Sequence, residues 1–356
     1  ISTRDWSSDV CSSDLKKFFL LVCVSILSLT LLSAVQAQVI RFAADDLVDP
    51  NNYVYAPARY LAKVIEEATM GKMKMEIHGG AVLGNGKSIV EQCQAGIIEV
   101  TESVEGLLAY FYPNIQVTAI PYIFRTEDIA YAVLDGSFGQ EMREDFRKKT
   151  GLRIISWAEN GGFRNFTTSK KKIKSPADMK GLKIRTMEIP AHMAMVKALG
   201  ANPIPIAWTE LYTALQTGVA DGQENAIPTI MLGKLEEVQK YVVLDKHVYS
   251  MQLVIVNDAW FLKQDKPLQN AILSAGRVMD AITRGICRLG ELNGTDYLKK
   301  KGLEIYQPTA EEYQQFKTLA QKPVIEWLRN QKNVDNVWID KLLKAVSDTE
   351  KQMGYR

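Results

Sequence analysis

The hydrophobic positions of the chain form two kinds of pattern that alternate along most of its length. Short apolar or alternating runs are typical of strands, and apolar residues that recur at helical spacing are typical of amphipathic helices. The predicted strands cover residues 39–45, 72–79, 97–103, 152–159, 163–169, 181–186 and 250–257. The predicted helices cover residues 60–68, 88–95, 128–135, 139–149, 190–200, 208–218 and 267–301. Thr309 and Glu312 have the spacing of a capping box, which predicts the start of a further helix.

This alternation of strands and helices predicts an α/β fold with a largely parallel or mixed sheet. The chain has 356 residues, 47% of them hydrophobic, which is enough for two domains of about 150 residues each. No low-complexity linker separates two halves of the sequence. We therefore expect the two domains to exchange strands and helices.

Residues 16–37 have the three parts of a secretory signal peptide. Two lysines precede the apolar run Phe18–Leu32, and Val35 and Ala37 occupy the small-residue positions that signal peptidase reads. We expect cleavage after Ala37 and a mature protein in the periplasm. Residues 1–15 match no part of such a signal, and we take them as a non-native segment.

Charge and chemistry exclude several classes of function. The 43 basic and 41 acidic residues give a net charge of +2, without the excess of positive charge typical of nucleic-acid-binding proteins. The three histidines and four cysteines are not spaced as zinc ligands, and neither the HExxH nor the GxSxG motif of hydrolases is present. The sequence therefore predicts no metal, no cofactor and no catalytic site. Cys93 and Cys287, which follow the signal peptide, are either two buried thiols or a disulfide.

The position of Arg185 makes it the strongest candidate for a ligand contact. It lies at the end of the predicted strand 181–186, just before a helix that Pro190 begins. In open α/β sheets this end of a strand borders the crevice in which ligands bind, and a guanidinium there can hold a carboxylate through two parallel hydrogen bonds. An ion pair with an Asp or Glu of the protein is the structural alternative.

A long central block of the sequence has a more specific pattern. It comprises the segments NGGFRNFTTS (160–169), SPADMKGLKIRT (175–186) and ALGANPIPIAWTELYTALQTGVADGQEN (198–225). This block resembles the solute-binding proteins of TRAP transporters (tripartite ATP-independent periplasmic transporters), of the C4-dicarboxylate-binding and sialic-acid-binding type. The resemblance extends over the whole chain after the signal peptide, including the segments 83–103 and 111–125.

The resemblance implies a two-domain clamshell of the periplasmic-binding-protein type, with the ligand in an interdomain cleft and a long connecting helix. We expect residues 38–160 and 251–290 to form domain I, and residues 161–250 and 291–356 to form domain II. The partners implied are a small organic acid and the membrane permease of the transporter. The oligomeric state stays open.

The resemblance also implies roles for individual residues. The family's carboxylate-clamping arginine falls on Arg185, and a second arginine that contacts the ligand in sialic-acid-binding members falls on Arg164. The ring that packs on the ligand falls on Trp208, the polar cleft residue on Asn225, and the cleft-lining glutamate on Glu102. The sequence reads QENA where the family has QENP, and residues 46–53 replace the usual early His-Pro region.

Tyr212 lies one helical turn after Trp208, so the two rings could form an aromatic floor beside Arg185; the alternative is that Tyr212 packs in the core. Two other functions stay open, a binding protein of an ATP-driven importer and a secreted enzyme acting on acidic sugars. In such an enzyme Arg185 would anchor the substrate and Glu102 would be the acid or base. The sequence leaves open whether the acid is a C4-dicarboxylate, a uronate, sialic acid, or an aromatic or keto acid.

Overall fold

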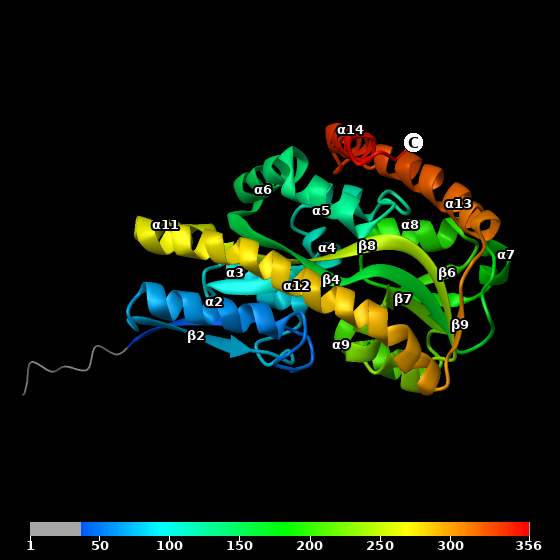
Figure 1. Cartoon of the computed structure of the whole chain (residues 1–356), viewed down its shortest axis with the longest axis horizontal. Helices are drawn as coiled ribbons and strands as arrows, with labels where there is room; N and C mark the ends of the chain where they lie inside the picture. The colour runs from blue at the N-terminus through cyan, green and yellow to red at the C-terminus, as the bar shows by residue number, and fades with distance from the viewer. Residues whose placement is uncertain (1–36, 356) are drawn as a thin grey trace, which may run out of the picture. The chain divides into compact units, whose positions relative to one another are not determined.

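The computed structural model describes residues 37–355 (Figure 1). The predicted signal peptide and the segment 1–15 lie outside the described residues. Among the residues that are described, no helix combines the length and the apolar character needed to cross a membrane.

In the described part of the chain nine strands form one mixed sheet, which confirms the predicted fold class. Their order in the sheet is β2-β1-β3-β8-β4-β7-β5-β6, and β9 pairs with β8. In chain order they are β1 (Gln38–Ala43), β2 (Met73–His78), β3 (Val100–Val104), β4 (Leu152–Thr168), β5 (Lys183–Thr186), β6 (Asn202–Pro205), β7 (Gly222–Ala226), β8 (Tyr241–Asn257) and β9 (Glu304–Tyr306). The pairs β1–β3, β5–β6, β5–β7 and β8–β9 are parallel, and β3–β8, β4–β7 and β4–β8 are antiparallel.

The two long strands β4 and β8 join the two groups of parallel strands. Residues 152–159 and 163–169, predicted as separate strands, belong to one continuous strand of 17 residues. The register between β4 and β8 shifts between Glu159 and Gly162, where Gly161 and Gly162 adopt φ values of +79° and +97°. These positive φ values suit glycine, and they allow the irregularity that bends the strand pair at its middle.

The helices cover the sheet, and those that have a predicted counterpart largely agree with its range. They are α2 (Tyr55–Ala68), α3 (Gly86–Gln94), α4 (Glu105–Leu108), α5 (Glu127–Asp135), α6 (Ser137–Thr150), α7 (Pro176–Met179), α8 (Pro190–Ala198), α9 (Trp208–Gln216), α10 (Ile227–Leu232), α11 (Asp258–Lys263), α12 (Lys266–Lys300), α13 (Ala310–Arg329) and α14 (Asn336–Gln352), with the 3₁₀ turns η1 (Pro113–Ala119) and η2 (Leu235–Glu237). The long helix α12, yellow to orange in Figure 1, packs against α2 and β4. The capping box of Thr309 and Glu312 is present at the start of α13.

The two cysteines of the described chain are free and buried. Cys93 lies in α3 and Cys287 in α12, and both contribute to hydrophobic clusters. The alternative of two buried thiols is therefore the one that the structure adopts.

Candidate functional site

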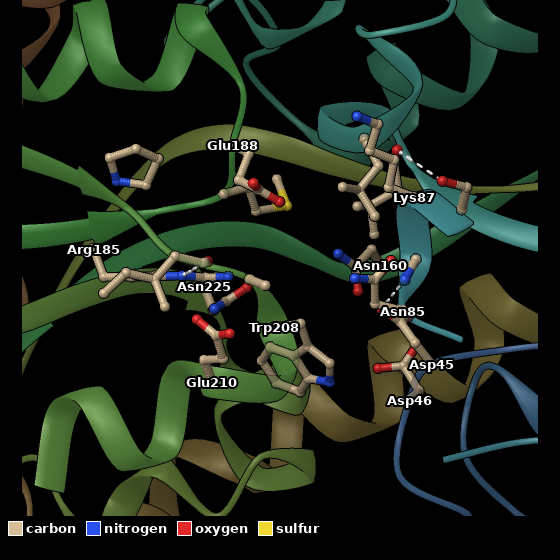
Figure 2. A pocket seen from close by; sticks show the side chains of 18 of the residues that line it. Asp45, Asp46, Asn85, Lys87, Asn160, Arg185, Glu188, Trp208, Glu210 and Asn225 are labelled. Carbon is tan, nitrogen blue, oxygen red and sulfur yellow. Dashed lines mark hydrogen bonds between the residues drawn. The ribbon is translucent and has the colours of Figure 1, made fainter. Parts of the chain in front are cut away.

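A cavity of about 310 Å³ lies where the carboxyl ends of the two groups of parallel strands meet (Figure 2). On one side it is lined by residues that follow β1, end β3 and begin α3. On the other side it is lined by residues that end β5 and β7 and begin α9. The carboxyl ends of parallel strands are the usual location of ligand sites in open α/β sheets.

Arg185 lines this cavity and is only 1% exposed. Its Nε donates a hydrogen bond to the carbonyl of Ile206 at 2.8 Å, and its Nη1 is buried without a partner among residues 37–355. No Asp or Glu within the described residues forms an ion pair with it. Burial is the main reason that its pKa falls to about 10, so the side chain still carries its charge at neutral pH. The cavity thus contains a buried cation that lacks an anionic partner within the part of the chain that the structure describes.

Arg164 is placed differently from the expectation drawn from the resemblance. It is fully buried outside the cavity lining and forms an ion pair with Glu224. Its Nη1 donates to the hydroxyl of Ser250 at 3.0 Å, and its Nη2 donates to Glu224 through both the backbone carbonyl and the carboxylate. The hydrogen-bonding groups of Arg164 are therefore engaged within the protein.

Glu224 is the centre of a buried charge network behind the cavity wall. Its carboxylate contacts His192 Nδ1 at 3.3 Å and His247 Nε2 at 3.2 Å, and His247 Nδ1 contacts Asp245 at 2.9 Å. Burial opposes the charge of Glu224, but Arg164 and His192 outweigh it and hold the pKa of Glu224 well below its usual range. Burial likewise opposes the charge of His247, but Asp245 and Glu224 raise its pKa. The charge of Arg164 is thus balanced inside this network.

Trp208 and Asn225 line the cavity, and Tyr212 does not. Asn225 donates to the side-chain oxygen of Gln223 at 2.6 Å. The hydroxyl of Tyr212 donates to Glu237 at 2.7 Å, and its ring packs beside the hydrophobic cluster that contains Leu211. The two rings therefore do not form a common floor for the cavity.

Glu102 lies behind the acidic end of the cavity rather than in its lining. It is 3% exposed, and carboxylate oxygens of Asp45, Asp46 and Glu102 all lie within 4.8 Å of one another. The side-chain amide of Gln252 donates to both Asp46 and Glu102, and Gly86 N donates to Asp45 at 2.8 Å. We call Asp45, Asp46 and Glu102 the acidic cluster.

Burial raises the pKa values of carboxyl groups in the acidic cluster. Burial, followed by the charge of Asp45, raises the pKa of Asp46 to about 7. Burial and the charge of Asp46 raise the pKa of Glu102 well above its usual range. Three carboxylates can hold a hard cation, but the Gln252 nitrogen already donates to two of them. The geometry suits acceptance of hydrogen bonds from N–H or O–H groups.

Several lining residues were not predicted from the sequence. Asp45 lies two residues after the end of β1, and Asn85 is the N-cap of α3, so both lie close to where an element begins or ends. Asn160 lies at the irregularity of β4 and accepts a hydrogen bond from Tyr53 at 3.2 Å. A polar residue beside a strand end was the available signal, but such residues are common in loops.

Figure 2 shows how the charges are distributed around the cavity. Arg185, Glu188 and Glu210 lie on one side, and Lys87, Asp45 and Asp46 lie on the other. Glu188 is half-buried and Glu210 is exposed, whereas Asp46 is buried.

Comparisons with known proteins agree with this arrangement. Residues 46–330 match the family described as "Bacterial extracellular solute-binding protein, family 7" (DctP). The 2,3-diketo-L-gulonate-binding periplasmic protein YiaO of Escherichia coli is 32% identical over 77% of this chain and 82% of its own length. The sialic acid-binding periplasmic protein SiaP of Vibrio cholerae is 29% identical over 73% of this chain and 81% of its own length.

Solved structures with the same fold hold small acids. The sugar acid binding protein of Advenella mimigardefordensis in complex with galactonate has a TM-score of 0.82 and 29% identity, over 88% of this chain and 99% of that one. A TRAP periplasmic solute binding protein of a Polaromonas species, bound to D-erythronate, has a TM-score of 0.80 and 28% identity, over 87% of this chain and 98% of that one. These matches agree with the predicted two-domain clamshell fold. The chain belongs to the family 7 extracellular solute-binding proteins, the solute-binding proteins of TRAP transporters.

Proposed function

We propose that this protein is the periplasmic receptor of a TRAP transporter and that it binds a hydroxylated monocarboxylate, such as a sugar acid, in the cavity beside Arg185. The observation that carries the proposal is the buried guanidinium of Arg185, which has an unpaired Nη1 and no ion-pair partner among the described residues. A carboxylate that leaves water needs charge-assisted hydrogen bonds to replace its hydration. Arg185 supplies them.

The charges of the lining favour one carboxylate rather than two. Four carboxylate side chains line the cavity against two cations; they are Asp45, Asp46, Glu188 and Glu210 against Lys87 and Arg185. A second carboxylate at the end opposite Arg185 would meet the acidic cluster, where like charges repel. Hydroxyl groups there would instead donate hydrogen bonds to Asp45 and Asp46. The bound galactonate and D-erythronate of the two similar structures are acids of this kind.

The roles of the other residues follow from their positions. Trp208 packs its ring against the ligand, and Asn225 offers an amide beside it. Arg164 and Glu102 act from behind the cavity wall, where Arg164 holds Glu224 and Glu102 supports Asp46 through Gln252. Tyr212 lies outside the cavity and takes no part in ligand contact.

Closure of two domains around the ligand is part of the proposal. Domain I comprises residues 38–160 and 251–290, and domain II comprises residues 161–250 and 291–356. The register shift at Glu159–Gly162, which faces residues 250 and 251 of β8, supports a hinge at this boundary. Helix α14 packs on α5 and α6 across the boundary, so this contact has to persist or slide when the domains move.

The other functions considered fit less well. The family match favours a TRAP permease over an ATP-driven importer as the membrane partner. An enzyme that uses Glu102 as acid or base would need its carboxyl group at the substrate, but Glu102 does not line the cavity. We propose that the protein binds and releases its ligand unchanged, and that export uses the signal peptide with cleavage after Ala37.

A thermal-shift and calorimetric screen of the purified protein tests the ligand class. The screen compares galactonate, D-erythronate and glucuronate, which carry one carboxylate and several hydroxyl groups, with succinate, which carries two carboxylates and no hydroxyl group. A true ligand at 100 times its Kd should stabilise the protein by about 2.7 kcal/mol. Preference for succinate over every hydroxylated monocarboxylate would contradict the proposed class, and release of a chemically altered acid would contradict a receptor.

A further inference from the structure

Trp208 and Gly233 lie against each other at the wall of the cavity. Trp208 begins α9, lines the cavity and is half-buried. Gly233 follows α10 as its C-cap residue. A Cβ atom built on Gly233 would lie 2.8 Å from Cη2 of Trp208 and 3.2 Å from Cγ of Leu235. Carbon atoms at optimal separation are about 3.5–4.0 Å apart, so any side chain at position 233 would collide with the indole.

The backbone does not explain the glycine at this position. Gly233 has φ −79° and ψ 0°, and residues of any type adopt negative φ values of this size. A glycine whose φ is negative is replaceable by alanine without left-handed strain. The space that the indole occupies is the physical reason that no side chain fits here.

We propose that Gly233 is a specificity-determining residue, because its missing side chain lets the indole of Trp208 lie back from the cavity and leaves room for the longer ligands. The proposal rests on the proposed function, in which Trp208 packs on the ligand. With a Cβ at position 233 the rigid indole has to shift. Leu235 is 1% exposed in the core and resists displacement, whereas the cavity on the ring's other side is open. The indole would therefore move into the cavity and shorten the space for ligand.

The experiment compares Gly233→Ala with wild type by calorimetry, using galactonate (six carbons) and D-erythronate (four carbons) as probes. The expected result is a fall of at least tenfold in the ratio of galactonate affinity to erythronate affinity. Trp208→Phe removes the ring atom Cη2, so the double variant Trp208→Phe/Gly233→Ala should recover most of that ratio. This non-additivity in a double-mutant cycle is the signature of direct contact.

Gly285→Ala is the matched control. Gly285 lies in α12, and a Cβ built on it meets no atom within 4 Å. It should leave both affinities unchanged. An unchanged ratio in Gly233→Ala, or additive effects in the double variant, would overturn the proposal.

A second measurement separates this proposal from the proposed function. If the wild-type protein binds neither probe, the proposed ligand class is wrong. The position of the Trp208 ring is then tested in the unliganded protein. The fluorescence difference between wild type and Trp208→Phe isolates the Trp208 emission. Gly233→Ala should shift that emission, as judged against Gly233→Ala/Trp208→Phe, and an unchanged emission would overturn the proposal. If Gly233→Ala unfolds while the double variant folds, the indole has no room to move into the cavity, and the proposal is wrong.

Discussion

Arg164 and Glu224 form an ion pair in which both side chains are fully buried, behind the wall of the cavity. The charges of both residues act on Arg185. Besides burial, which lowers the pKa of Arg185 most, the charge of Glu224 raises this pKa and that of Arg164 lowers it. Because Glu224 is already held by Arg164 and two histidines, the buried cation Arg185 is left available to pair with a ligand.

Replacing Arg185 by alanine should weaken ligand binding by about 2–5 kcal/mol, the range for truncating one partner of a buried charge pair. Arg185→Lys should recover only part of the loss, because a point charge does not reproduce two parallel hydrogen bonds. The melting temperature of the unliganded protein should fall much less than the affinity does, since Arg185 has no ion-pair partner in the described chain to leave unpaired and gives up one hydrogen bond, to the carbonyl of Ile206. Calorimetry and thermal melts of the same samples measure both effects.

Lys183→Ala is the control for Arg185→Ala. Lys183 lies on the same strand, and its ammonium group donates to the carbonyl of Gly218 at an exposed position. Its removal should leave the affinity unchanged. A large fall in unliganded stability of Arg185→Ala with affinity retained would show that Arg185 is a structural residue.

Replacing Arg164 by methionine should destabilise the unliganded protein by about 3–5 kcal/mol, because it leaves the Glu224 carboxylate buried without its partner. Urea denaturation measures the loss. The double variant Arg164→Met/Glu224→Gln should lose less than the sum of the single changes. Arg329→Met, which breaks a largely exposed pair with Asp340, should lose no more than about 1 kcal/mol. Full stability of Arg164→Met together with lost affinity would instead make Arg164 a ligand contact.

The stability of the protein should depend on pH through Asp46. Its pKa rises from 3.8 to about 7 in the folded protein, mainly because of burial. The folded state therefore holds the proton more tightly than the unfolded state, and this contribution to stability is lost as the pH rises through about 7. Asp46→Asn mimics the neutral acid, so its stability relative to wild type should increase from pH 5 to pH 8. Only about two of the three pKa units of this shift lie above pH 5, so the gain between pH 5 and pH 8 should be at most about 3 kcal/mol, at about 1.4 kcal/mol for each pKa unit.

Asp296→Asn is the control for Asp46→Asn, because it makes the same change of charge at a residue whose side chain is 78% exposed. It should show no such change between pH 5 and pH 8 in the same denaturation experiments. If Asp46→Asn loses stability relative to wild type as the pH rises, Asp46 is ionised and stabilising in the folded protein, and its pKa is lowered rather than raised.

Trp208→Ala should weaken binding by about 1–3 kcal/mol, because the ligand loses the apolar ring that lines the cavity. Tyr212→Ala should leave affinity unchanged, since Tyr212 lies outside the lining and bonds to Glu237. Calorimetry on both variants measures the difference. Equal losses in the two variants would indicate that both rings reach the ligand.

Local patterns in the sequence were sufficient to predict most helices and their ends. The predicted helix 267–301 corresponds to α12 at Lys266–Lys300, and the capping box at Thr309 is formed as expected. Helical spacing and caps depend on residues within a few positions of one another. The class of protein was also predicted, because the segment around Arg185 carries a specific family pattern.

Elements that depend on distant partners were not predicted correctly. The strands β6 and β7, at Asn202–Pro205 and Gly222–Ala226, are short and carry polar residues. They become strands by pairing with β5, and β7 also pairs with the central β4. The continuity of β4 through residues 160–162 likewise depends on its pairing with β8.

The two arginines show most clearly what sequence determines and what tertiary structure decides. The strand patterns of the sequence placed Arg164 and Arg185 on strands, and the family resemblance implied that both contact the ligand. The two arginines differ in whether a protein carboxylate already pairs with them. Glu224, which is 60 positions from Arg164 along the chain, is in direct contact with Arg164 in the fold. Whether a guanidinium is available to a ligand depends on which charges surround it, and only the packing of β4, β5 and β7 brings those charges together.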